Sequence, residues 1–162
     1  MKLLHIVRHG KSSWDYPGID DLDRPLIDKG IKNVIATGNY LLENYGQPDI
    51  IISSPAIRAL HTAMLLARTC GVPYGKIIID ERIYESYSST IIEAVEEMPA
   101  HYQSLVVVGH NPMLTEFCNL FLPDYLENLP TAGLVTLTFD IKDWNIVNQQ
   151  PVASKVFFPR KD

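Results

Sequence analysis

The sequence predicts an α/β protein, a three-layer α/β/α sandwich in which a mostly parallel central sheet carries helices on both faces. Short runs of aliphatic and β-branched residues alternate with segments whose apolar residues recur at the i, i+3, i+4 and i+7 spacing of an amphipathic helix. The central runs are apolar throughout, which is typical of parallel strands buried on both sides. Such alternation indicates strands joined by crossover helices.

Length and composition fit one domain covering residues 1–162. Hydrophobic residues make up 46% of the chain and charged residues 20%, as in an ordinary soluble globular protein. The formal net charge of −5 argues against nucleic-acid binding, because no basic cluster exceeds the short pair Arg160-Lys161. A small anionic substrate stays compatible with this charge, since local arginines can overrule the global sign.

The N-terminal apolar segment ends at Val7, too early for a secretory signal, and no apolar run is long enough to span a membrane. We therefore expect a cytoplasmic protein without a membrane partner. Cys70 and Cys118 lie far apart and lack metal-ligand spacing, so both are interpreted as small core residues.

The first strand, Leu3 to Val7, leads into Arg8-His9-Gly10 and then into a polar loop, Lys11 to Arg24. The carboxyl ends of strands form the ligand crevice of open α/β sheets, so His9 is placed for chemistry. The glycine after it is expected to let the backbone turn sharply out of the sheet. Helical periodicity follows from Ile31 to Tyr45, and Gly46 is expected to end that helix.

The β-branched run Asp49 to Ser53 indicates a second buried strand. Ser54 and Pro55 then match the N-cap and N1 preferences of a helix, which predicts a helix over Ala56 to Cys70, ended by glycine. Arg58 falls in its first turn, where a guanidinium beside free helix N–H groups favours phosphate binding.

The second half of the chain continues the pattern. We expect a third strand over Lys76 to Ile79, a loop from Asp80 to Ser89, and a helix from about Thr90 to Met98. A fourth strand, Leu105 to Val108, ends in Gly109-His110-Asn111-Pro112. Asn111 is expected to cap the next helix and Pro112 to open it, through about Leu122, and two strands near a sheet edge follow, Leu134 to Ile141 and Val152 to Phe158.

Two arginines and two histidines thus follow successive strands: Arg8 and His9 after the first, Arg58 after the second, and His110 after the fourth. Because the carboxyl ends of parallel strands meet at one edge of a sheet, these side chains should face a single crevice.

With these residues the sequence resembles the histidine phosphatase superfamily, which includes the phosphoglycerate mutases, and in particular its short SixA-like phosphohistidine phosphatases. The resemblance spans nearly the whole chain. It rests on Arg8-His9-Gly10, Arg24-Pro25-Leu26 with Gly30, Ser54-Pro55-x-x-Arg58-Ala59-x-x-Thr62-Ala63, Ile83-Tyr84-Glu85 and Gly109-His110-Asn111-Pro112. Ile27 stands where relatives commonly carry Thr, which leaves the first helix without its usual cap.

The resemblance implies a phosphoglycerate mutase-like fold and His9 as a nucleophile that forms a phosphohistidine intermediate. Arg8, Arg58 and His110 are implied to hold the phosphoryl oxygens, without a metal or other cofactor. The residue types fit this chemistry, because phosphoryl transfer asks mainly for an in-line nucleophile and positive donors. The predicted substrate-binding set is Arg8, Arg58, His110, Gly10, Ser12 and Asn111, and the side chains expected at the pocket mouth are Lys11, Ser12, Trp14 and Arg24.

The proton donor to the leaving group has two candidates in the loop after the third strand. Alignment with the family favours Glu85 over Glu81 as the catalytic acid. A third alternative is that neither acts, since a phosphohistidine leaving group needs less help.

The predicted function is a phosphoric monoester hydrolase, most specifically a protein phosphohistidine phosphatase. The alternatives are a small-molecule phosphomonoesterase of the same superfamily and a catalytically weak phosphohistidine-binding regulatory protein. The expected partner is therefore a phosphorylated protein or a small phosphate ester. A nucleotide-binding module is disfavoured, because neither G-x-x-x-x-G-K-[ST] nor G-x-G-x-x-G occurs.

Overall fold

The computed structural model describes residues 1–84 and 87–159. Its centre is a six-stranded sheet in the order β3-β2-β4-β1-β5-β6. β3, β2, β4 and β1 are parallel to one another, whereas β5 is antiparallel to β1 and to β6. The strands are β1 (Lys2–Arg8), β2 (Ile50–Ser53), β3 (Ile77–Ile79), β4 (Ser104–Gly109), β5 (Leu134–Phe139) and β6 (Ala153–Phe157).

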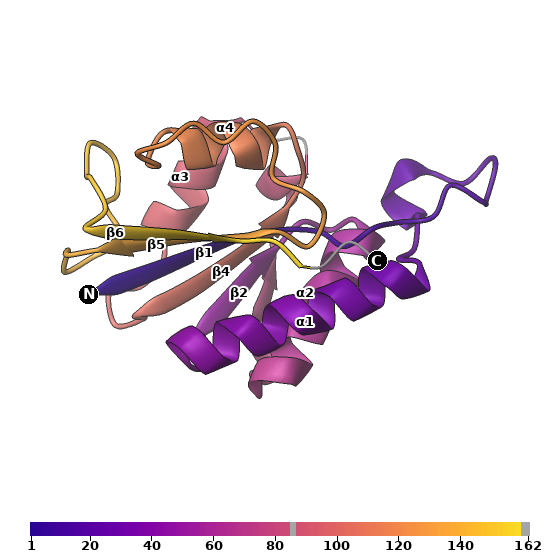
Figure 1. Ribbon diagram of the computed structural model, residues 1–162, viewed down its shortest axis with the longest axis horizontal. Coiled ribbons are helices and arrows are strands. Elements are labelled where there is room, and N and C mark those ends of the chain that lie inside the picture. Colours follow the sequence, from indigo (N-terminus) through magenta and orange to yellow (C-terminus); the bar gives the residue numbers. More distant parts are fainter. Residues whose placement is uncertain (85–86, 160–162) are drawn as a thin grey trace.

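Helices cover both faces of this sheet, which confirms the predicted three-layer α/β/α fold (Figure 1). The helices α1 (Asp28–Tyr45) and α2 (Ile57–Cys70) lie on one face, and α3 (Ser88–Glu96) and α4 (Met113–Asn119) lie on the other. In the described part of the chain no helix is long and apolar enough to cross a membrane.

The central strands supply side chains to two separate cores, one under each helical layer. In β4, Leu105 and Val107 pack with α3 and α4, while Val106 and Val108 pack with α1 and α2. Since side chains alternate between the faces of a strand, an apolar residue is required at every position. Cys70 and Cys118 are buried in the two cores, as predicted.

The predicted helix ends at Gly46 and Gly71 are confirmed, with φ values of 79° and 76° that favour glycine. The predicted cap of the second helix is wrong. α2 begins at Ile57, and its N-cap is Ala56, which makes no side-chain capping bond. The Ser54 hydroxyl instead accepts from the Ala56 N–H and contacts His110.

Other boundaries move by a few residues. Pro112 precedes the first residue of α4 as its N-cap, and the helix ends at Asn119 before a series of tight turns, short of the predicted Leu122. The predicted N-cap, Asn111, lies one residue before the observed one, but its Oδ1 accepts from the Thr115 N–H in the first turn of α4. Ile27 makes no side-chain cap for α1, in agreement with the sequence.

Close packing, and not an unusual backbone angle, explains the glycine after His9. A Cβ on Gly10 would lie 2.8 Å from Val34 Cγ2 and 3.0 Å from the Gly30 carbonyl oxygen. Gly30 in turn lies against the Lys11 backbone, where its own Cβ would meet the Lys11 nitrogen at 2.8 Å and the Lys11 carbonyl oxygen more closely still. The expectation of a sharp glycine turn at Gly10 is therefore replaced by a requirement for close approach to α1.

We predict that Gly30→Ala lowers stability by about 1–3 kcal/mol, the usual cost of overpacking. This is opposite in sign to the gain of about 1 kcal/mol that alanine normally gives inside a helix. Thermal unfolding measures the effect, and Gly75→Ala is the matched control, because a Cβ there meets no atom within 4 Å. An equal or higher Tm for Gly30→Ala would contradict the packing.

Candidate active site

The site lies where the neighbouring strands β1 and β4 end. Arg8 is paired with Gly109 in this parallel register, so His9 and His110 follow side by side, with ring centroids 5.0 Å apart. β1 leads to α1 on one face of the sheet and β4 leads to α4 on the other. Their divergence opens a crevice of the kind that binds ligands in open α/β sheets.

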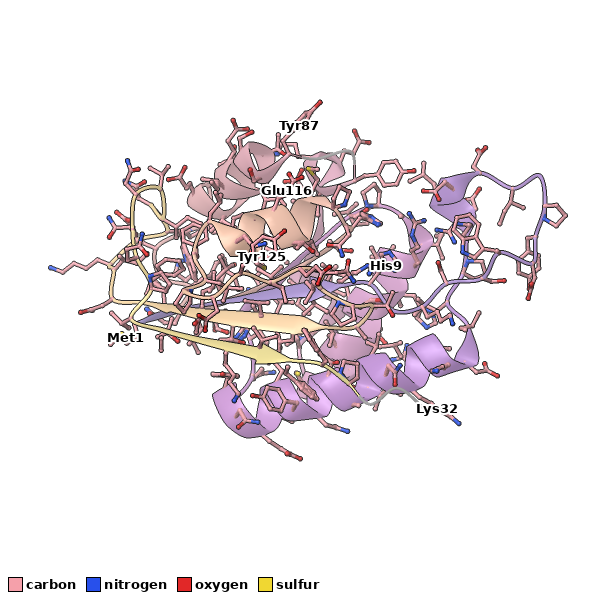
Figure 2. All side chains as sticks on the ribbon, turned by 45° about the horizontal axis from the view of Figure 1, so that its top comes forward. Met1, His9, Lys32, Tyr87, Glu116 and Tyr125 are labelled. Atoms are coloured by element: carbon pink, nitrogen blue, oxygen red, sulfur yellow. The ribbon has the colours of Figure 1, made fainter. Side chains whose placement is uncertain are left out.

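A cavity of about 270 Å³ occupies this crevice. It lies at the end of the sheet where Figure 2 labels His9, next to the projecting loop between β1 and α1. Its lining brings together Arg8, His9, Lys11, Ser12, Trp14, Arg24, Arg58, His110, Asn111 and Thr131. All of these except Thr131 are residues that the sequence pointed to, as site or pocket-mouth positions. Gly10 does not line the cavity.

A relay of hydrogen bonds holds the His9 imidazole. Its Nδ1 lies 2.7 Å from the Gly10 carbonyl oxygen, which can only accept, so Nδ1 carries the proton. The Gly10 N–H donates to Thr62 Oγ1, and that hydroxyl donates to the Arg58 carbonyl. The tautomer leaves the lone pair on Nε2, so Gly10 acts by orienting His9 and not by lining the site.

Both histidines are neutral near pH 7. Burial lowers the pKa of His9 to about 4, opposed by the Gly10 hydrogen bond and assisted by the nearby arginine charges. Burial also lowers the pKa of His110 to about 3, with the neighbouring His9 and the charge of Arg58 acting in the same direction. A neutral imidazole is the nucleophilic form, which suits His9 for attack on phosphorus.

The arginines of the cavity are held by backbone and side-chain acceptors. Arg8 Nη1 donates to the Leu129 carbonyl at 3.0 Å, and its buried Nε finds no partner among the described residues. Burial lowers the pKa of Arg8, which means that its charge is costly where it lies. Arg24 Nη1 donates to Ser12 Oγ, and its guanidinium stacks 3.5 Å from the ring centroid of Trp14.

His110 and Asn111 are tied into the surrounding structure. His110 Nε2 lies 2.7 Å from Ser54 Oγ, and its Nδ1 is buried without a partner in the described part of the chain. Asn111 Nδ2 donates to the Leu129 carbonyl at 2.8 Å. The Asn111 side chain, predicted to bind substrate, is thus already bonded to the Leu129 carbonyl and to the Thr115 N–H.

The predicted catalytic acid, Glu85, lies outside the described residues. Its rival Glu81 is exposed in the 3₁₀ turn η3 (Glu81–Ile83) and does not line the cavity. Asp21, which sequence reasoning did not single out, contacts the site from the turn η1 (Asp21–Asp23) and bonds to Arg58 and Arg24. The acidic run Asp20-Asp21-Leu22-Asp23 was its only signal.

Comparison with known proteins decides the family. The family model of the histidine phosphatase superfamily (branch 1) matches residues 4–89. An uncharacterised protein of Mycobacterium tuberculosis is 35% identical over 142 residues, which cover 81% of this chain and 85% of that protein. The chain belongs to the histidine phosphatase superfamily. Membership supports a phosphatase activity.

Solved structures share the fold. The chain superimposes on the putative phosphohistidine phosphatase SixA of Agrobacterium tumefaciens with a TM-score of 0.79 and 23% identity, covering 95% of this chain and 97% of that one. It also resembles a mycobacterial glucosyl-3-phosphoglycerate phosphatase, with a TM-score of 0.66, 17% identity and 98% of both chains covered. The predicted phosphoglycerate mutase-like fold is confirmed.

We predict that His9 and His110 stay unprotonated down to about pH 5, as followed by NMR titration of the imidazoles with His9→Gln and His110→Gln for assignment. The unfolded chain binds these protons at about pH 6.5, so stability is fully present above that pH and falls as the pH is lowered toward 4. The slope is at most about 1.4 kcal/mol per pH unit for each histidine. A His9 midpoint at or above 6.5 would show that the site is not desolvated as described.

Proposed function

We propose that this protein hydrolyses phosphohistidine carried on another protein, through a phosphohistidine intermediate on His9. The observation that carries the chemistry is the bond from His9 Nδ1–H to the Gly10 carbonyl, which leaves Nε2 as the nucleophile in a cavity lined by Arg8 and Arg58. The arrangement resembles an activated nucleophile whose second ring nitrogen is fixed by a backbone acceptor.

The lining favours a dianionic ligand. Arg8, Lys11, Arg24 and Arg58 all line the cavity, and no Asp or Glu stands among its described lining residues. Arg24 and Arg58 are paired with Asp21, whereas the partly buried Arg8 makes no ion pair among the described residues. Its desolvation cost is one that a phosphoryl group offsets with charge-assisted hydrogen bonds. The local charge is therefore opposite to the net charge of −5 of the whole chain.

In the proposed reaction, His9 Nε2 attacks phosphorus in line and forms a P–N bond as the bond to the leaving group breaks. Arg8, Arg58 and His110 stabilise the charge on the equatorial oxygens. The leaving group takes up a proton, for which Glu85 remains the predicted donor. Water then attacks the phosphohistidine, releasing inorganic phosphate and restoring neutral His9.

The first test is His9→Ala, which should lower turnover of p-nitrophenyl phosphate by roughly a thousandfold or more, because the covalent step is lost. Circular dichroism should show an intact fold. Rapid mixing of the wild type with radiolabelled substrate and an alkaline quench should trap label on His9, labile to acid. Label on Ser, Asp or Cys, or wild-type activity in His9→Ala, would rule out the mechanism.

The rim of the cavity supports a protein substrate. The loop between Lys11 and Arg24 carries exposed apolar side chains, namely Trp14 (78% exposed), Tyr16, Ile19 and Leu22. Asp15, Asp20 and Asp23 are exposed beside them. A small cavity under an apolar, acidic rim fits a phosphoryl group presented by a surface that is apolar and basic. A small metabolite, in contrast, needs a walled pocket with several polar groups that fix it.

We predict that a phosphohistidine protein has a higher kcat/KM than sugar phosphates or nucleotides. The double substitution Tyr16→Ser and Ile19→Ser should lower kcat/KM for the protein about tenfold and leave p-nitrophenyl phosphate unchanged, because these side chains are exposed on the loop of residues 11–24 and do not line the cavity. The matched control, Val147→Ser with Val152→Ser, removes exposed apolar groups near the β5–β6 connection.

Two results would count against this assignment. Turnover of a small phosphate ester at least as efficient as that of the best phosphohistidine protein favours the small-molecule phosphomonoesterase. Failure to turn over any aryl phosphate favours a phosphohistidine-binding regulatory protein.

A further inference from the structure

Asp21 makes hydrogen bonds to two arginines that line the cavity, Arg24 and Arg58. Its Oδ2 accepts from Arg58 Nη2 at 2.8 Å and from Tyr84 Oη at 2.7 Å, and its Oδ1 accepts from Arg24 Nε at 3.1 Å. Its backbone carbonyl accepts from Arg58 Nη1 at 2.6 Å. Asp21, in the loop between β1 and α1, thereby holds the guanidinium of Arg58 on α2.

Asp21 bonds to only part of the Arg58 guanidinium. A guanidinium has five N–H donors in one plane, and Asp21 engages one on each Nη, along the end of the fork. Arg58 Nε is buried and has no partner among the described residues. The Nε–H and the remaining Nη2–H form the side edge of the fork, which suits two oxygens of a phosphoryl group. Asp21 therefore holds Arg58 without using the edge that a phosphoryl group needs.

The two arginines depend on Asp21 unequally. Arg24 has other anchors, since its Nη1 donates to Ser12 Oγ and to the Ser13 carbonyl. All the hydrogen bonds that the Arg58 guanidinium makes within the described residues go to Asp21. Without Asp21, the Arg24 guanidinium would keep its bonds to Ser12 and Ser13, whereas the Arg58 guanidinium would lose the hydrogen bonds that fix its orientation.

Asp21 also stays charged. Partial burial opposes ionisation, but hydrogen bonds from Tyr84, Arg58 and Arg24 outweigh it and hold the pKa of Asp21 well below its usual range. A carboxylate that does not take up a proton near neutral pH cannot serve as the general acid.

We propose that Asp21 is a positioning residue, which aims the free edge of Arg58 at the phosphoryl group and couples the loop of residues 11–24 to α2. The inference rests on the proposed function only in that Arg58 binds the phosphoryl group. It holds for any phosphorylated substrate of this site.

A role of Asp21 as a competitor of the anion predicts the opposite change in anion affinity. If the Asp21 carboxylate occupied the phosphoryl position as a built-in competitor, its removal would free the arginines and tighten anion binding. If it positions Arg58, its removal weakens anion binding. The sign of one measurement separates the two.

The experiment is a double-mutant cycle on orthovanadate affinity, measured by titration calorimetry with wild type, Asp21→Ala, Arg58→Ala and the double variant. Asp21→Ala should weaken binding about tenfold, which corresponds to about 1.4 kcal/mol, and should add at most about twofold in the Arg58→Ala background. Asp21→Asn, which keeps the shape and loses the charge, should weaken binding severalfold. The control is Asp140→Ala, which removes an exposed acid next to Phe139, paired with Lys2 at the end of β1 opposite to the cavity, and should leave vanadate binding unchanged.

Unchanged or tighter vanadate binding in Asp21→Ala would overturn the proposal. A full tenfold loss that persists in the Arg58→Ala background would do so too, because Asp21 would then act by another route. If Arg58→Ala alone leaves vanadate binding intact, the assignment of the phosphoryl site fails instead. Vanadate needs no leaving group, so a wrong substrate class would not disturb these results.

Discussion

The parallel register between β1 and β4 is the constraint on which the site depends. It pairs Arg8 with Gly109, so that the residue directly after the end of each strand is a histidine. A slip of one residue would turn the side chains of β4 to the wrong faces, moving Leu105 and Val107 out of one core and Val106 and Val108 out of the other. The hydrophobic packing of the sheet interior therefore fixes the distance between two polar rings at its edge.

Most of the fold was predictable because it follows from periodicity and from residues with special backbone preferences. Gly46 and Gly71 end helices where their sequence positions indicate. Ser54 shows where local preference fails. Its place before Pro55 matches a helix cap, but the tertiary contact with His110 uses the hydroxyl, and the helix begins later.

The site was predictable in part for a similar reason. Arg8 ends β1, His9 and His110 directly follow β1 and β4, and Arg58 lies in the first turn of α2, so their positions are tied to the regular part of the chain. Asp21 lies in a loop without periodicity, and its contact with Arg58 spans 37 residues of sequence. Nothing local distinguishes it from Asp20 or Asp23, since the difference arises only from how the loop folds over α2.

The side chains of the loop of residues 11–24 divide into those exposed to solvent and those bonded to the site. Tyr16 and Ile19 are exposed to solvent, where the proposed protein substrate would meet them, whereas Asp21 is bonded to Arg58. The loop is anchored on its inner side by charge-assisted bonds, which limits the conformational entropy that docking on its outer side would cost. The same loop meets the cavity in two ways: Lys11, Ser12, Trp14 and Arg24 line it directly, and the Asp21–Arg58 ion pair ties the loop to α2, so a change in the loop is felt both in the cavity lining and at the guanidinium of Arg58.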